Sequence, residues 1–217
     1  MINKDYIMRM IQQLTVVLAK VLLKKENNNL NEANFLLDAA FEDIIGLDYN
    51  FIKGISSENI LSLMNIDGGK PISAGKIIIT AKLLFEKAKI ENDIKDNRDY
   101  LNNCQKSLFL YLEGFTKGEN NDDFIDFIKD VDELAKNFSY EELPDEINYK
   151  LFKFYDQYSM YNEAENILFY LKSINFTDII GEGELFYKNL ENLSDEELKL
   201  NNFSREEIKT GFKDLLK

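Results

Sequence analysis

The chain has 217 residues, 45% of them hydrophobic, and a formal net charge of −13. This apolar content supports a sizeable core and excludes disorder over the whole length, while the negative charge argues against binding to a nucleic-acid backbone. Histidine is absent, which excludes His-dependent catalytic triads and His-ligated metals. With only two prolines and ten glycines, the composition predicts an all-α protein.

The first expected helix covers residues 4–25. Its apolar positions recur at alternating intervals of four and three, and they are Ile7, Ile11, Leu14, Leu18 and Val21. This spacing predicts a heptad seam. Lys4, Arg9, Lys20, Lys24 and Lys25 outnumber Asp5, so a basic arm precedes an acidic body.

Four interpretations of this basic arm remain open. Its apolar stripe could pack into the body of the same chain, pair with a second copy, receive a protein partner, or lie on an anionic membrane surface. No stretch reaches the ~18 consecutive apolar residues that a bilayer requires, since the run from Met10 to Ala19 ends at Lys20. We therefore expect a cytoplasmic protein without a transmembrane segment, for which peripheral membrane contact is not favoured.

The next segments alternate between helices and breaks. A helix is expected over 31–45 with Gly46 as its stop, then a loop over 47–55 and a short helix over 57–66. The clearest break is 67–71, which contains Gly68, Gly69 and Pro71. It suggests an N-terminal segment of residues 1–66 and a hairpin region of residues 67–217, continuous with the first as one domain.

Two helices over 73–93 and 97–116 are expected to form an antiparallel hairpin. Cys104 lies in the apolar pattern of the second helix, which predicts a small buried hydrophobe rather than a reactive thiol. A further helix is expected from 121 or 122 to 137. Its stripe of Asp122, Asp126 and Asp130 is either a solvated face or a site for a cation or basic partner.

The segment from Leu151 to Leu171 resembles a tetratricopeptide-type hairpin, with helices expected over 144–158 and 162–174. No second unit follows at the ~34-residue period of such repeats. The hairpin is rich in aromatic residues, which either pack in the core or form a groove for a peptide or helix. Tyr155, Tyr158 and Tyr161 are the candidates for partner binding, and Tyr158 and Tyr161 are expected to be exposed because they lie near the turn.

Two Ser-x-x-Glu boxes near the C-terminus predict two short closing helices. The boxes pair Ser194 with Glu197 and Ser204 with Glu207, so that side chains satisfy the free amides at each helix start.

The opening segment Lys4 to Leu14, KDYIMRMIQQL, is similar to the start of an uncharacterised bacterial family, a domain of unknown function that begins with a DYIMRMI-type helix. The resemblance covers about the first 25 residues. It implies an all-helical cytoplasmic protein of low-GC Gram-positive type, and it brings no catalytic residues.

These observations predict an all-α stack of antiparallel helical hairpins, tetratricopeptide-like, whose function the sequence does not define. We expect a non-enzymatic interaction or scaffold protein without cofactor or metal, which binds a protein partner or a second copy through Ile7, Ile11, Leu14 and Leu18 or through the hairpin tyrosines. The alternatives are a carboxylate-based helical protein that binds a small molecule or metal, and a structural homodimer.

Overall fold

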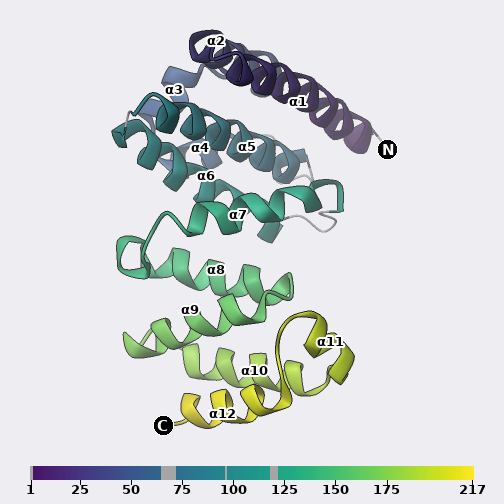
Figure 1. The fold of residues 1–217 in the computed structure, drawn as a ribbon, viewed down its shortest axis with the longest axis vertical. Coiled ribbons are helices and arrows are strands. Elements are labelled where there is room, and N and C mark those ends of the chain that lie inside the picture. Colours follow the sequence, from purple (N-terminus) through teal and green to yellow (C-terminus); the bar gives the residue numbers. More distant parts are fainter. Residues whose placement is uncertain (1, 65–71, 96, 118–121) are drawn as a thin grey trace. The chain divides into compact units, whose positions relative to one another are not determined.

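The structure is a computed structural model that describes residues 2–64, 72–95, 97–117 and 122–217 (Figure 1). Within these ranges the chain is all-α and contains no strand, as predicted. The helices form two compact units, unit 1 (Met1–Asn137) and unit 2 (Phe138–Lys217). The sequence suggested a boundary at 67–71, and these residues lie outside the described part of the chain.

Unit 1 is built from helical hairpins. Its elements are α1 (Ile2–Glu26), α2 (Leu30–Ala40), the π-helical turn η1 (Phe41–Ile45), α3 (Tyr49–Gly54), α4 (Ser57–Met64), α5 (Ile72–Asp93), α6 (Asn97–Lys117), the 3-10 turn η2 (Asp122–Phe127) and α7 (Ile128–Ala135). α1 packs on α2 and α5, and α5 pairs with α6 along their lengths. The expected hairpin over 73–93 and 97–116 is therefore confirmed.

The α5–α6 hairpin supplies the centre of unit 1. Ile77, Ile78 and Ile79 are completely buried, so α5 contacts neighbours on several sides, as a helix that is apolar on most of its surface requires. Ser107 of α6 donates a hydrogen bond to the Ala81 carbonyl of α5 at 2.7 Å, which joins the two backbones closely. Cys104 is completely buried on the same helix, as the apolar pattern predicted.

Two local predictions in unit 1 were wrong, and one was confirmed. Residues 47–55 are not a loop, because Asp48 caps α3 by accepting a hydrogen bond from the Phe51 amide at 2.9 Å. The helix expected over 31–45 is confirmed, since α2 continues into the π-helical turn η1 and stops at Gly46, whose φ of 78° suits a residue without a Cβ. The acidic segment 122–127 is a 3-10 turn rather than the first part of one α-helix.

Unit 2 contains the 3-10 turn η3 (Tyr140–Glu142) and the helices α8 (Asp145–Gln157), α9 (Tyr161–Ser173), α10 (Ile179–Glu191), α11 (Asp195–Leu200) and α12 (Arg205–Leu215). α8 pairs with α9, which confirms the predicted hairpin, and α10 packs against α9 and α12. Side chains along both helices of this hairpin are buried, among them Leu151, Tyr155, Ala164, Leu168 and Leu171. The sequence did not predict α10.

The C-terminal caps follow the sequence pattern. Ser194 and Glu197 form the reciprocal capping box at the start of α11. Ser204 caps α12 by accepting a hydrogen bond from the Glu207 amide at 3.2 Å. Both helix starts are thus placed where local side-chain chemistry predicted them.

Candidate functional site

The surface of α1 is the first candidate, because an unusually apolar helix is left largely open. Residues Asp5–Glu26 are long and apolar enough to cross a membrane by length and composition, and 22% of the most apolar 18-residue stretch within them is buried in the structure. Such a test is also passed by core helices and by signal sequences, so it does not establish a membrane span. The question is therefore which side of α1 is covered.

The buried side of α1 carries part of the predicted seam. Ile7 and Leu14 face the core with 9% and 1% of their surface exposed, together with Met10 at 2%. Ile11 and Leu18 are only half-buried. The expectation that all of these seam residues share one partner-binding face is therefore wrong, because α2 and α5 already cover Ile7 and Leu14.

A second seam lies beside the buried one, and we call it the edge stripe. It consists of Met8, Ile11, Thr15, Leu18 and Leu22, at alternating intervals of three and four. Three of these side chains are half-buried, and Leu22 is 58% exposed. The Thr15 hydroxyl donates to the Ile11 carbonyl at 2.9 Å, so its hydrogen-bonding capacity is used within the helix. The stripe is thus apolar, helically spaced and incompletely covered.

Ion pairs at the end of α1 show which side the edge stripe occupies. Lys24 pairs with Glu32 of α2 at 2.8 Å, whereas Lys25, three residues beyond Leu22, pairs with Asp93 of α5 at 2.9 Å. Positions three or four apart share a helix side, so Lys25 lies next to both the exposed Leu22 and the buried Val21. At Leu22, the end of the edge stripe is therefore next to the side of α1 that contacts α5.

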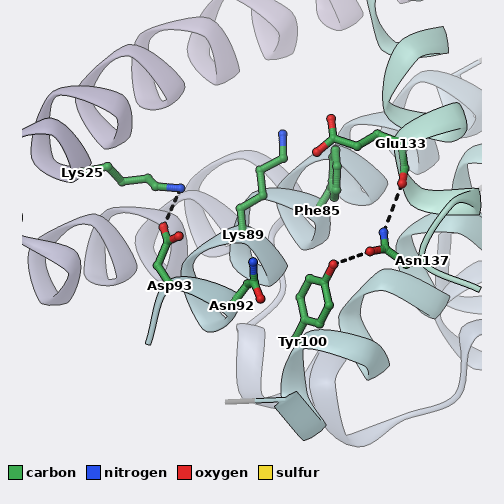
Figure 2. A pocket seen from close by; sticks show the side chains of 8 residues that line it. All are labelled: Lys25, Phe85, Lys89, Asn92, Asp93, Tyr100, Glu133 and Asn137. Carbon is green, nitrogen blue, oxygen red and sulfur yellow. Dashed lines mark hydrogen bonds and ion pairs between the residues drawn. The ribbon is translucent and has the colours of Figure 1, made fainter. Parts of the chain in front are cut away.

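A pocket lies at the end of this stripe in unit 1 (Figure 2). It encloses about 190 Å³ and collects side chains from α1, α5, α6, α7 and the residue two positions after α7. They are Lys25, Phe85, Lys89, Asn92, Asp93, Tyr100, Glu133 and Asn137. No sequence pattern pointed to it, because its lining comes from segments more than a hundred residues apart.

The pocket walls are ordered by internal contacts. The Tyr100 hydroxyl donates to Asn137 Oδ1 at 2.5 Å, and Asn137 Nδ2 donates to the Glu133 carbonyl at 3.1 Å. The Lys89 ammonium lies 3.9 Å from the centre of the Phe85 ring. Burial, with the Cys104 thiol and the Glu133 carboxylate nearby, raises the pKa of Tyr100, so this hydroxyl stays protonated and donates near neutral pH.

A buried polar network also lies in unit 1. The Tyr49 hydroxyl donates to Glu91 Oε1 at 2.8 Å, and Asn103 Nδ2 donates to Glu91 Oε2 at 2.7 Å. The Lys87 ammonium lies 3.9 Å from the Tyr49 ring centre and pairs with Asp38 at 2.6 Å. Burial raises the pKa of Glu91 despite the two donated hydrogen bonds. The network joins α2, α3, α5 and α6 through polar contacts that sequence periodicity does not reveal.

The predicted acidic stripe does not form. Asp130 is buried, pairs with Lys82 at 2.8 Å and accepts a hydrogen bond from the Tyr111 hydroxyl at 2.8 Å. Asp126 is exposed, and the side chain of Asp122 lies outside the described residues. The 3-10 turn explains the difference, since residues four apart align only in an α-helix. Among the residues described, no group of three His, Cys, Asp or Glu side chains could hold a metal ion.

Two of the three candidate tyrosines of the α8–α9 hairpin lie in the core of unit 2. Tyr155 is 4% exposed and Tyr161 is 8% exposed, whereas Tyr158 is half-buried. Tyr161 packs edge-on against Phe186 and Phe203, with ring centres 6.3 and 6.2 Å apart. The predicted exposure of Tyr161 was therefore wrong, because α10 and the segment before α12 cover the turn.

These features define an all-α protein of packed helical hairpins, with an open apolar helix edge and a small polar pocket in its first unit. The chain belongs to a family of unknown function, DUF6483, whose model matches residues 1–61 and 74–217. This match confirms the resemblance expected from the opening helix and extends it over nearly the whole chain. Comparison with curated proteins found no match, and comparison with solved structures found none.

Proposed function

We propose that this protein is a non-enzymatic, cytoplasmic interaction protein whose edge stripe receives an amphipathic helix from a protein partner. The observation that carries the proposal is the heptad spacing of Met8, Ile11, Thr15, Leu18 and Leu22 along a side of α1 that its own chain leaves partly open. Positions at this spacing form a continuous ridge on which a second helix can pack by inserting its side chains between them.

The anchoring of α1 supports this function. Leu14 and Val21 are almost completely buried, so the helix is held in unit 1 while the edge stripe remains accessible. A surface that is already ordered loses less conformational entropy when a partner binds. The tetratricopeptide-like interpretation of the α8–α9 hairpin belongs to the same proposal, since stacked hairpins of that class serve as scaffolds for partners.

The test places a charge on the edge stripe. Leu22→Glu introduces a carboxylate at a position that is 58% exposed, so the fold should lose no more than about 0.5 kcal/mol, because surface changes are well tolerated. Val16→Glu is the matched control, since Val16 is 54% exposed on another side of the same helix. Thermal unfolding would verify that both variants are folded.

The readouts are light scattering after size exclusion and cross-linking of captured partners, with the cross-links mapped onto the chain. We expect cross-links along α1, and binding at least about tenfold weaker for Leu22→Glu than for Val16→Glu. If the complex is a dimer that Leu22→Glu dissociates, the partner helix comes from a second copy. A chain that stays monomeric and forms no α1 cross-links, or equal losses in both variants, would contradict the proposal.

A further inference from the structure

The charges of the pocket at the end of the edge stripe are not all used within the protein. Lys25 and Asp93 neutralise each other at 2.9 Å. Lys89 contacts Glu86 at 3.3 Å, yet an ammonium group has three donors and the Lys89 side chain remains 29% exposed. Glu133 is exposed, and no ion pair engages its carboxylate within the described part of unit 1. One cation and one anion thus remain available on the pocket wall.

These two groups come from facing elements of the pocket. Lys89 extends from α5 and Glu133 from α7, and Figure 2 shows both side chains on the side where the Phe85 ring lies. The ring is only 2% exposed, and the Lys89 ammonium lies 3.9 Å from its centre, so the pocket wall is mostly polar. Asn92 adds an amide that can donate or accept, and the Tyr100–Asn137 hydrogen bond holds the opposite wall.

The size of the pocket limits the ligand. At about 190 Å³ it is smaller than the roughly 300–1,000 Å³ of sites for drug-sized molecules. A ligand with a single charge would meet one attractive and one repulsive group here, whereas a molecule with both charges would satisfy each of them.

We propose that this pocket binds a small zwitterion of the free amino-acid class. The ligand's ammonium group pairs with Glu133, and its carboxylate pairs with Lys89. The two residues that pair with the ligand, Lys89 and Glu133, lie outside α1, so this binding does not require the edge stripe to be occupied.

The test is calorimetric titration of the full chain with L-leucine, L-glutamine, L-glutamate and L-lysine. Each amino acid is compared with its N-acetyl derivative, which lacks the ammonium charge, and its amide, which lacks the carboxylate. We expect saturable binding of at least one free amino acid, weakened at least about tenfold by either modification.

Variants then assign the binding to the pocket. Lys89→Gln and Glu133→Gln each remove one charge from a partly or fully exposed side chain and should weaken binding at least about tenfold. Lys20→Gln and Glu42→Gln, both exposed elsewhere in unit 1, are the controls and should leave affinity unchanged. The proposal is overturned if none of the four amino acids binds, if blocking either charge has no effect, or if the pocket variants bind as well as the controls.

Discussion

Glu91 shows how single residues in unit 1 depend on partners from distant segments. Its carboxylate is 6% exposed and is held by neutral donors, Tyr49 and Asn103, rather than by an ammonium group. Asn103 Oδ1 is buried without a hydrogen-bond partner, so this network is not fully satisfied. A buried carboxylate in such surroundings is more easily protonated in the folded chain than in the unfolded chain.

The raised pKa of Glu91 predicts a pH dependence of stability. The folded state binds the Glu91 proton more tightly than the unfolded state, so this stabilisation is present at low pH and is lost as pH rises through the folded pKa. The free energy of unfolding of the native chain should therefore fall relative to Glu91→Gln as pH rises from about 4 to about 8. Urea unfolding of both proteins at several pH values measures this difference.

Glu86→Gln, on the same helix, is the control, because its effect on stability should change with pH in the opposite direction. Burial raises the pKa of Glu86, but the ammonium groups of Lys82 and Lys89 outweigh burial and lower it. Its stabilisation is present above the unfolded pKa and is lost as pH falls. The native chain should therefore gain stability relative to Glu86→Gln as pH rises. A native chain whose stability relative to Glu91→Gln stays constant or rises as pH increases would refute the prediction for Glu91.

At the scale of the element, α10 is defined by how closely it approaches its neighbours. A Cβ on Gly183 would lie 2.7 Å from Leu215 Cδ2 and 3.0 Å from Leu168 Cδ1. Both leucines are buried, with 1% and 0% of their surface exposed. Gly181, on the same helix, has no atom within 4 Å of the corresponding position. One glycine therefore permits close helix packing, and the other faces open space.

Alanine substitutions separate these two roles. Gly183→Ala should lower the free energy of unfolding by about 1–3 kcal/mol, because overpacking displaces buried side chains. Gly181→Ala should be neutral or stabilising by up to about 1 kcal/mol, because alanine favours the helix more than glycine does. Denaturant unfolding monitored by circular dichroism compares the two variants, and equal effects would show that α10 does not pack on α12 as described.

In the first helix, too, the packing of neighbouring helices decides which side is buried. Its sequence contains two overlapping heptad seams that share Ile11 and Leu18, one continuing through Ile7 and Leu14 and the other through Met8 and Leu22. The spacing of apolar residues alone does not indicate which of the two seams is buried. The packing of α2 and α5 buries Ile7 and Leu14 of the first seam and leaves the second as the edge stripe.

At the scale of the whole molecule, the chain contains two compact units, each with its own buried core. The core of unit 2 includes Phe152, Leu168 and Phe186, which come from α8, α9 and α10. A unit that encloses its own apolar side chains can fold separately.

A fragment of residues 138–217 should therefore fold alone. We expect a helical circular dichroism spectrum and one cooperative thermal transition, because α8 to α12 bury their apolar sides against one another. The comparison is a fragment of residues 175–217, which lacks the α8–α9 hairpin and should show no cooperative transition. A fragment of residues 138–217 without cooperative unfolding would mean that unit 2 depends on unit 1.

The sequence by itself determined the helix class, the approximate bounds of the long helices and the burial of Cys104. These features depend on local periodicity, breaks and caps, which act within one or two turns of chain. Tertiary structure decided which seam of α1 is covered, why Tyr161 is buried and how residues from Lys25 to Asn137 line one pocket. Those outcomes depend on how separate helices pack, because a helical pattern defines possible buried sides without specifying the neighbour that covers each one.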